Sequence, residues 1–384
     1  MKVKLGDGCE IVSGTTPKSD CPKYWDGNIN WITPAELTES SDIIYESQRK
    51  ITELAVVDSS LKPFPAGTVL LSSRAPIGKV AISGVEMYCN QGFKNLICSN
   101  KIFNRYLFHF LKNKTEYLNS LGRGATFKEI SKNIVEKIEI PLPPLDEQRH
   151  IAAVLDKVSD LIALRKKQLA KLDELVKARF VEMFGINTRQ VPLTDYVWFQ
   201  EGPGVRSVDF VDKGTILLTG SNINNNTISF GHKSDRFIAY ELSSGKYAHF
   251  MCDKDDILVV SSAIDPDKFD KKVVVVDCNK KYCLNTGIIR FKLSKGHLTT
   301  GYFREFLKSD YFKYQVNGEM RGIAQMHFGP SHLKRMNILL PESIEIQDSF
   351  ELFVQQTDKI KLLFQQGLEK LETLKKSLMQ EYFG

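Results

Sequence analysis

The sequence predicts two α/β or α+β domains in tandem, each followed by a long helix. Three observations support this fold class: the length of the chain, an internal repeat and two extended heptad patterns. With 384 residues, the chain exceeds what one hydrophobic core usually holds together. We therefore expect domains at residues 1–143 and 190–341, and long helices at residues 144–185 and 344–384.

The repeat consists of matching segments that keep the same order in both halves, at a shift of about 200 residues. A period this long indicates duplicated domains rather than a stack of short repeats. The paired segments are Leu5-Gly6-Asp7 with Leu193-Thr194-Asp195, Ile32-Thr33 with Leu218-Thr219, Gly67 to Ser73 with Asp256 to Ser262, Asn90-Gln91-Gly92 with Asn285-Thr286-Gly287, Arg123-Gly124 with Arg321-Gly322, Ile140-Pro141 with Leu340-Pro341, and Met183-Phe184-Gly185 with Tyr382-Phe383-Gly384.

The first long helix has a start signal and a stop signal. The segment Pro141-Leu142-Pro143-Pro144 precedes it, and proline is tolerated only in the first turn of a helix. Asp146 and Glu147 suit the positive end of the helix dipole, and Gly185 ends the pattern. Its apolar residues recur at steps of three and four: Ile151, Leu155, Val158, Ile162, Leu169, Leu172, Val176 and Met183.

The second long helix repeats this heptad pattern. About 40 residues at about 1.5 Å each give a rod of about 60 Å, which cannot bury an apolar stripe alone. We expect the two rods to pack on each other as a coiled coil; the alternative is that each rod pairs with another chain. The stripe residues are Phe350, Phe353, Thr357, Ile360, Phe364, Leu371, Leu374 and Leu378.

Short elements are expected in the globular halves. Val69–Ser73 and Lys79–Ile82 are typical of strands, and residues 104–111 of a helix. We expect a strand again over residues 131–140. In the second half, Val273–Val276 is the clearest strand and Tyr302–Leu307 the clearest helix.

Composition narrows the class of protein. No apolar run reaches the roughly 18 residues that a membrane span needs, and the N-terminus lacks the apolar stretch of a signal peptide. We therefore expect a cytoplasmic protein without a membrane partner. The seven cysteines form no CxxC pair, which disfavours zinc ribbons and a disulfide framework.

Motifs of catalysis are missing from the sequence. Gly78-Lys79 and Gly245-Lys246 lack the surroundings of a phosphate loop, and no dinucleotide or zinc motif is present. Pro266-Asp267 lies too close to Asp270-x-Lys272 for a metal-dependent nuclease, whose carboxylates come from separate strands. We expect no catalytic residue, no metal site and no cofactor in this chain. An enzyme in its own right remains an alternative.

Cationic and polar turns recur in both halves and suit DNA binding. The net charge is +6, Arg and Lys neutralise phosphates, and Arg, Asn, Gln and Ser bind base edges. The candidates in the first half are Lys18, Arg74, Lys79, Asn90, Gln91, Lys94, Arg123 and Lys128, and those in the second half are Arg206, Asn222, Lys268, Lys271, Lys272, Arg321, Gln325 and His327.

Six segments of the sequence together match the motifs of a known family: Leu5-Gly6-Asp7, Ser13-Gly14-Thr15-Thr16-Pro17, Trp31 to Leu37, Leu70 to Lys79, Cys89 to Phe93, and Ile140 to Gln148. On these segments the chain resembles the specificity subunit of type I restriction–modification systems over essentially its whole length. In the second half, Ser261-Ser262-Ala263 aligns with Ser72-Ser73-Arg74 and lacks the arginine.

The resemblance implies a function and an arrangement. Each globular half would be a target recognition domain for one half of a split, asymmetric double-stranded DNA site, and the two helices would form an antiparallel coiled coil between the domains. Two methyltransferase subunits would dock on this scaffold, and restriction (motor–nuclease) subunits would join them. S-adenosylmethionine, ATP and magnesium would be bound by those partners. A protein-binding adaptor without DNA affinity is the alternative.

Overall fold

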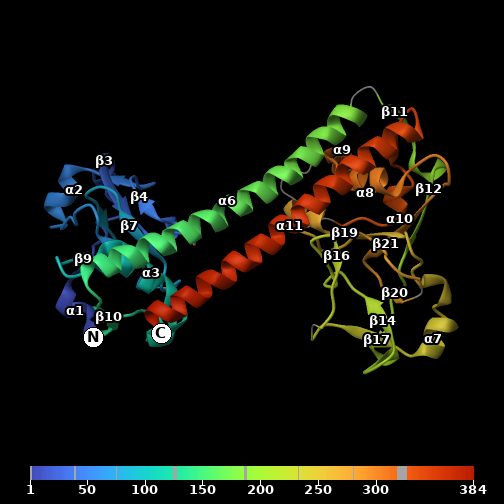
Figure 1. Cartoon of the computed structure of the whole chain (residues 1–384). Helices are drawn as coiled ribbons and strands as arrows, with labels where there is room; N and C mark the ends of the chain where they lie inside the picture. Colours follow the sequence, from blue (N-terminus) through green and yellow to red (C-terminus); the bar gives the residue numbers. More distant parts are fainter. Residues whose placement is uncertain are drawn as a thin grey trace. The chain divides into compact units, whose positions relative to one another are not determined.

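The computed structural model describes residues 2–38, 40–74, 76–123, 128–185, 188–231, 233–279, 281–317 and 327–384. It divides into two compact units. Unit 1 comprises Met1–Lys166 and Gln366–Gly384, and unit 2 comprises Lys167–Gln365. Each unit therefore contains one globular domain together with part of both long helices (Figure 1).

Unit 1 is built around a five-stranded sheet, antiparallel except at the β4–β7 pair, with helix α3 (Asn104–Asn113) packed on β6 and β7. A second sheet has the order β5-β3-β8. In the first sheet the strands, in spatial order, are β2 (Cys9–Val12), β9 (Asn95–Cys98), β6 (Val69–Leu71), β7 (Val80–Ser83) and β4 (Ile43–Ile44). The other elements are β1 (Lys2–Lys4) paired with β10 (Glu139–Pro141), β3 (Trp25–Ile32), β5 (Lys50–Ile51), β8 (Tyr88–Cys89), α1 (Leu5–Gly8), α2 (Glu53–Asp58), α4 (Thr115–Leu121) and α5 (Lys132–Glu136).

Unit 2 has the corresponding sheet in the order β12-β21-β18-β19 and a second one in the order β13-β17-β14-β20. Its strands are β11 (Arg189–Pro192) paired with β22 (Asn337–Leu340), β12 (Val197–Glu201), β13 (Phe210–Val211), β14 (Thr215–Leu218), β15 (Ile223–Asn224), β16 (Thr227–Ile228), β17 (Arg236–Ile238), β18 (Ile257–Val260), β19 (Val273–Val275), β20 (Tyr282–Leu284) and β21 (Ile288–Leu293). Its short helices are α7 (Tyr240–Ser244), α8 (Thr300–Lys308), α9 (Asp310–Asn317) and α10 (Pro330–Leu333).

Most of the expected short elements are present. The predicted strands at 69–73 and 79–82 correspond to β6 and β7, and the predicted helices to α3 and α8. The continuous strand expected over 131–140 is wrong, because α5 occupies its first part and only β10 is extended. The Ser131 hydroxyl accepts a hydrogen bond from the backbone N–H of Ile134 and so starts this helix.

The long helices are α6 (Leu145–Phe184) and α11 (Ile344–Phe383). The predicted stripe of α6 is buried or half-buried throughout. In α11 the stripe is wrong at two positions, since Ile360 and Leu374 are 42% and 46% exposed. The neighbouring Lys361 and Lys375 are half-buried instead. A lysine can cover apolar surface with its methylene stem while its ammonium reaches a polar group, so hydrophobicity alone misplaces such positions.

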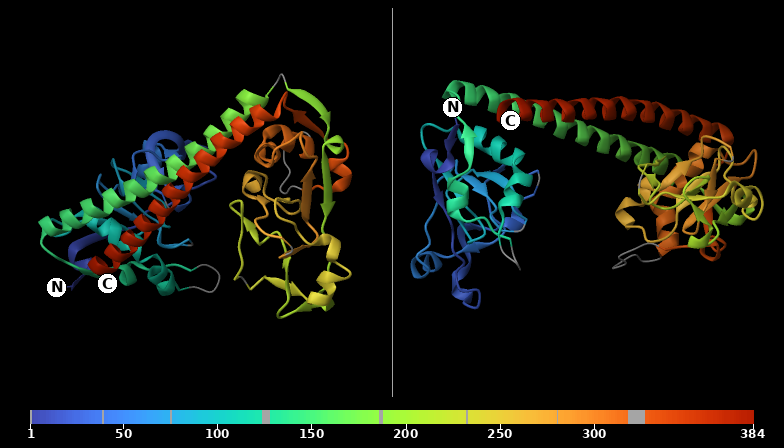
Figure 2. Two further views of the ribbon diagram at one scale, coloured as in Figure 1. Left: turned by 45° about the vertical axis from the view of Figure 1, so that its right-hand side comes forward. Right: turned by 90° about the horizontal axis from the view of Figure 1, so that it is seen from below.

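The two helices pair antiparallel within the chain. In unit 1, Met379 and Phe383 from the end of α11 join the core that contains Ile151 and Leu155 from the start of α6. In unit 2, Phe180 and Phe184 from the end of α6 join the core that contains Phe350 from the start of α11. Figure 2 shows the end of α6 and the start of α11 side by side at this domain. Each unit therefore brings the beginning of one helix beside the end of the other, as expected for an intramolecular pair.

A buried glutamine attaches each domain to the helix that follows it. Gln148 accepts a hydrogen bond from the backbone N–H of Phe103 (2.9 Å) and donates to the carbonyl of Lys101 (3.0 Å). Gln347 does the same with Thr299 (2.9 Å) and His297 (2.9 Å). Both side chains are fully buried. Gln148 and Gln347 thus form equivalent hydrogen bonds in the two copies, as the duplication inferred from the sequence leads one to expect.

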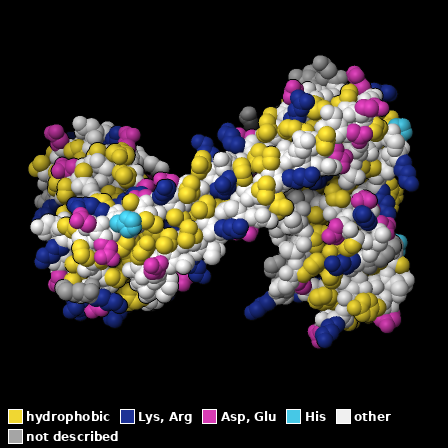
Figure 3. Space-filling view, in the orientation of Figure 1, with side chains coloured by type: hydrophobic (Ala, Val, Ile, Leu, Met, Phe, Trp, Pro, Cys, Tyr) yellow, Lys and Arg dark blue, Asp and Glu magenta, His cyan; other side chains and the backbone are white. Residues whose placement is uncertain are grey.

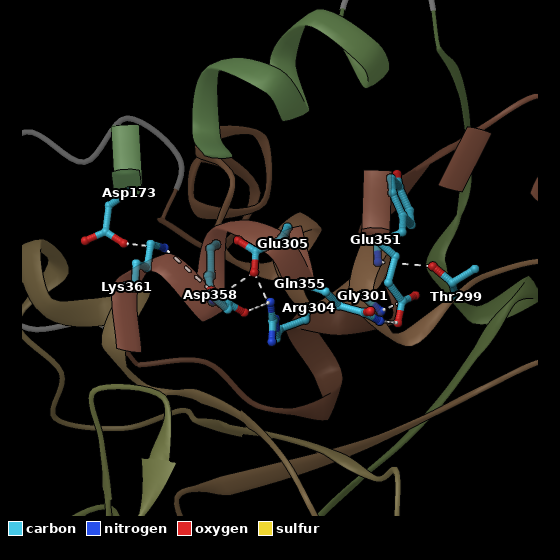
Figure 4. Close-up of polar contacts among 11 residues, drawn as sticks. Asp173, Thr299, Gly301, Arg304, Glu305, Glu351, Gln355, Asp358 and Lys361 are labelled. Carbon is cyan, nitrogen blue, oxygen red and sulfur yellow. Dashed lines mark hydrogen bonds and ion pairs between the residues drawn. The ribbon is translucent and has the colours of Figure 1, made fainter. Parts of the chain in front are cut away.

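An arginine–aspartate contact is the second repeated attachment. In unit 1, Arg105 of α3 lies 2.8 Å from Asp156 of α6. In unit 2, Arg304 of α8 lies 3.1 Å from Asp358 of α11, which also pairs with Lys361 (Figure 4). Burial raises the pKa of Asp156, but hydrogen bonds from His109 and Arg105 outweigh it and lower the pKa to about 2. These ion pairs fix the orientation of each domain on its own segment of the helix pair.

Among the described helices, none is both long and apolar enough to cross a membrane.

Candidate nucleic-acid interface

Two of the candidate cations, Lys79 and Lys272, occupy the same structural position in the two domains. The Lys79 ammonium donates to the carbonyls of Leu37 (2.5 Å) and Pro34 (3.4 Å). The Lys272 ammonium donates to the carbonyls of Ile223 (2.8 Å) and Gly220 (3.1 Å), and burial lowers its pKa. Each lysine therefore fastens a turn of its own domain, and its donors are used within the protein.

The turn held by each lysine is closed by a side chain that takes the same role in both copies. In unit 1, Glu36 accepts from the backbone N–H of Thr33 (2.8 Å). In unit 2, Asn222 accepts from the backbone N–H of Thr219 (2.9 Å) and donates to Asp235 (2.8 Å). Asn222 is 1% exposed. Its amide is therefore part of the framework and not accessible to DNA in this structure, which corrects its place among the candidate contacts.

The backbone contacts also correct the register of the repeat by one residue. Ser73 donates to the carbonyl of Gly92 (2.7 Å) and accepts from Ile130 (2.9 Å). Ser261 makes the matching bonds, to Gly287 (2.8 Å) and from Phe328 (2.9 Å). Ser73 thus corresponds to Ser261 rather than Ser262. Consequently Arg74 corresponds to Ser262 and Glu129 to His327.

One edge of the unit 1 domain gathers several sequence-predicted residues. The exposed Gln91 accepts a hydrogen bond from the Thr16 hydroxyl (2.5 Å), which ties the loop containing Lys18 to the loop after β8. Gly92 of that loop receives the Ser73 bond, which places Arg74 at the same edge. Half-buried Asn90 accepts from the backbone N–H of Gly92 (2.9 Å) and shapes the loop.

A carboxylate organises the cations at this edge. Glu129 contacts Arg74 (2.9 Å) and Lys94 (3.2 Å), and it exchanges two backbone hydrogen bonds with exposed Arg123. Burial raises the pKa of Glu129, yet the hydrogen bonds from Arg74 and Lys94 hold it below its ordinary value. Lys94 is 8% exposed, so it serves to hold Glu129, whereas Arg74 remains 45% exposed. Exposed Lys128 lies directly before Glu129 in the chain.

We call this set the unit 1 edge: Lys18, Asn90, Gln91, Arg74, Arg123, Lys128 and Glu129.

The unit 2 domain has the equivalent edge with different side chains. The backbone N–H of Thr286 donates to the carbonyl of Pro203 (3.0 Å), and that of Val205 donates to the Asn285 side chain (3.3 Å). These bonds place exposed Arg206 at the loop that follows β20. The Ser261 contacts bring Ser262 and exposed His327 to the same loop.

The unit 2 edge is therefore formed by Arg206, Ser262, Asn285, Thr286 and His327.

The remaining candidates lie on the β18–β19 connection or outside the described residues. Lys268 is exposed and 2.9 Å from Asp265, and Lys271 is exposed. Both follow Ser262 in the same connection. Arg321 and Gln325 lie outside the described residues. The sequence does not indicate Glu129 as part of the edge, because a carboxylate that orders cations from distant segments has no periodic signal.

Among the described residues, no three His, Cys, Asp or Glu side chains form a group suited to a metal ion. A cavity of about 700 Å³ in unit 2 includes none of the residues of either edge. It is lined by Gly214, Thr215, Ile216, Tyr240, Ser243, Ser244, Ala248, Met251 and Lys281.

Known proteins match both the sequence and the fold. Residues 1–174 match the family model of the type I restriction modification DNA specificity domain. The type I restriction enzyme MjaIX specificity subunit of Methanocaldococcus jannaschii is 42% identical over 184 residues, covering 47% of this chain and 43% of that protein. The MjaVIII specificity subunit of the same organism is 26% identical, over 98% of this chain and 90% of its own length.

Two solved structures share the fold over the full chain. The crystal structure of the type I restriction-modification system S subunit from M. genitalium has a TM-score of 0.54 at 14% identity, with 96% of that chain covered. A structure from work on complex assembly and conformational transition of the type I R-M system has a TM-score of 0.62 at 17% identity, with 97% covered. At these identities the likeness concerns the fold alone.

The fold and the repeated edges define the class: a chain of two duplicated domains on a shared helix pair, with the fold of an S subunit. Residues 1–174 are similar to the type I restriction modification DNA specificity domain, and nearly the whole chain is similar in sequence to the MjaVIII specificity subunit. The chain spans less than half the length of the MjaIX subunit.

Proposed function

We propose that this chain is the DNA sequence-recognition subunit of a type I restriction–modification complex, and that each domain binds one half of a split, asymmetric duplex site. The two equivalent edges carry this proposal. Their frameworks coincide at Lys79 and Lys272, yet Arg74 in unit 1 corresponds to Ser262 in unit 2. Different side chains on one framework suit two different half-sites, whereas identical edges would suit a palindrome.

The cations of the unit 1 edge suit duplex DNA. Arg74, Arg123 and Lys128 are exposed, and arginine can bind a phosphate or the paired acceptors of guanine. Glu129 holds the Arg74 side chain in one place, so less rotamer entropy is lost on binding. A charged edge of this kind predicts affinity that falls steeply with salt.

The helices would carry the partner subunits. Leucines are exposed on both of them: Leu161 and Leu164 of α6 are 42% and 52% exposed in unit 1, and Leu362 and Leu363 of α11 are 60% and 66% exposed in unit 2. Figure 3 shows hydrophobic side chains among Lys and Arg on the long helices. Exposed apolar groups of this kind mark protein-binding surfaces. Two methyltransferase subunits would dock here, joined by restriction subunits.

In this proposal the chain itself is non-catalytic and cytoplasmic. S-adenosylmethionine, ATP and magnesium would be bound by the partner subunits. A protein-binding adaptor without DNA affinity predicts the opposite result for DNA and is less favoured, since the edges carry exposed arginines in both units. An enzyme in its own right predicts turnover by the purified single chain.

The test is DNA binding as a function of salt. The full chain with its methyltransferase partners should bind duplex DNA, with log affinity falling linearly against log salt. Arg74→Ala should weaken binding by about 1–3 kcal/mol, the range of one specific arginine contact. Lys101→Ala is a matched control. Lys101 is exposed and follows the C-terminal end of β9, whereas Lys94 precedes the opposite end of that strand. Absence of DNA binding, or an unchanged affinity of Arg74→Ala with a normal control, would contradict the proposal.

A further inference from the structure

Beside the unit 1 edge, the guanidinium of an exposed arginine lies over an aromatic ring. The Arg49 guanidinium carbon is 3.8 Å from the centroid of the Trp25 ring and 5.5 Å from that of Trp31. The two indoles meet edge to face, with centroids 5.1 Å apart. Trp31 is buried, Trp25 is half-buried and Arg49 is exposed, so the arginine forms the outer layer of this stack.

The stack is directly continuous with the unit 1 edge. The Trp25 indole N–H donates to the carbonyl of Lys18 (3.2 Å), and the Trp31 indole N–H donates to the carbonyl of Thr15 (3.1 Å). The loop that carries Lys18 is therefore held by hydrogen bonds from the same two indole rings that Arg49 contacts. The same loop reaches Gln91 through Thr16. Through Trp25 and the Lys18 loop, Arg49 is thus connected to the unit 1 edge.

The charge of Arg49 has no carboxylate partner among the described residues. Two acidic side chains near it in sequence are already bonded elsewhere: Glu46 pairs with Lys50 (2.6 Å), and Glu36 accepts from the backbone N–H of Gln48 (2.6 Å). The backbone of Arg49 is fixed, because its carbonyl accepts from the Ser47 hydroxyl (2.6 Å). The guanidinium therefore lies against a ring face on a fixed backbone, and its N–H groups have no hydrogen-bond acceptor within the described part of the chain.

A guanidinium stacked on an aromatic face presents its N–H groups in one plane. That geometry matches a pair of hydrogen-bond acceptors, which duplex DNA offers either as guanine O6 and N7 or as two phosphate oxygens. Stacking on tryptophan also limits the side-chain entropy that binding would cost. From these contacts we propose that Arg49 is a DNA contact of the first domain, held for this role by Trp25. The inference rests on the proposed function and adds a residue to it.

Selection of binding sites from a random-sequence duplex pool tests the inference. The full chain with its methyltransferase partners is compared with Arg49→Ala, Arg49→Lys and the control Lys101→Ala. Wild type and control should select the same bipartite site, and Arg49→Ala should bind it at least about five-fold more weakly, the lower limit of one bidentate contact. Thermal unfolding checks that each variant keeps its fold. If Arg49→Ala does not fold, Arg49→Lys still tests the inference, because lysine retains the charge and the methylene stem.

The lysine variant distinguishes the two acceptors. If the acceptors are those of guanine, Arg49→Lys should bind more weakly and accept other bases at one position of one half-site. If they are phosphate oxygens, Arg49→Lys should keep the selected sequence and most of the affinity, and Arg49→Ala should reduce the salt slope by about one. Folded Arg49 variants with wild-type affinity, sequence preference and salt slope would overturn the inference. A wild-type chain that selects no site would instead contradict the proposed function.

Discussion

Replacing Phe184 by alanine tests how the end of α6 is fixed in unit 2. Phe184 is 1% exposed, and its ring centroid lies 4.8 Å from that of Tyr302 and 5.2 Å from that of Phe350. A buried Phe→Ala change costs about 3–5 kcal/mol, because contacts are lost and a cavity remains. With contacts to α8 and α11 both removed, we expect a loss of about 4 kcal/mol in the free energy of unfolding of unit 2.

Hydrogen exchange of the full chain measures this loss for each unit separately. About 4 kcal/mol corresponds to nearly a thousand-fold decrease in amide protection, which should appear in α8 of unit 2 and not in α3 of unit 1. Leu175→Ala is the control, since Leu175 lies on the same helix and is 48% exposed. A decrease of less than ten-fold in α8, or an equal decrease in α3, would refute the assignment of Phe184 to the core of unit 2.

Three further predictions concern the framework. Asp156→Asn should remove a pH dependence of the stability of unit 1. Because the pKa of Asp156 is lowered to about 2, its contribution to this stability is present above about pH 4 and is lost as the pH falls toward 2. Acid unfolding of wild type and variant measures the difference. Lys272→Met should destabilise unit 2 by about 1–3 kcal/mol in urea unfolding, because the lysine donors bind backbone carbonyls. For the same reason the salt slope of DNA binding should stay unchanged. A slope lower by about one would mean that Lys272 contacts phosphate. Deleting seven residues from each long helix shortens each helix by about 10 Å and should shorten the spacer between half-sites by about three base pairs. Methylation-site sequencing measures the spacer, and an unchanged spacer would contradict a role of the helices in setting it.

The long helices were predictable from the sequence because a heptad pattern over 40 residues is a strong signal. The observed α6 and α11 begin and end within one residue of the expected bounds. The errors lie where another interaction changes the pattern. Lys361 pairs with Asp173 across the helix pair, so it takes an inward position that the sequence assigned to Ile360. Short α5 has too few turns to show a helical period, and only its capping serine announces it.

The individual roles of the candidate residues were not predictable from the sequence. A lysine in a polar turn has the same chemistry whether it faces DNA or a carbonyl of its own chain. Lys79 and Lys272 bind turns more than 40 residues away in sequence, and no local pattern shows such contacts. Arg49 was not predicted for the same reason, since its partner Trp25 belongs to β3, whereas Arg49 lies in the loop before β5. Local pattern identifies the loops, and tertiary contacts decide which side chains remain available.

The corrected register, in which Arg74 corresponds to Ser262, separates two kinds of position. Residues that fasten the domains, such as Lys79 with Lys272 and Gln148 with Gln347, form the same bonds in both copies. The exposed position at the edge carries a cation in one copy and a small hydroxyl in the other. If the edges bind DNA as proposed, a mutation at that position changes the bound sequence without disturbing the fold, so a new target and a stable fold need not be selected together.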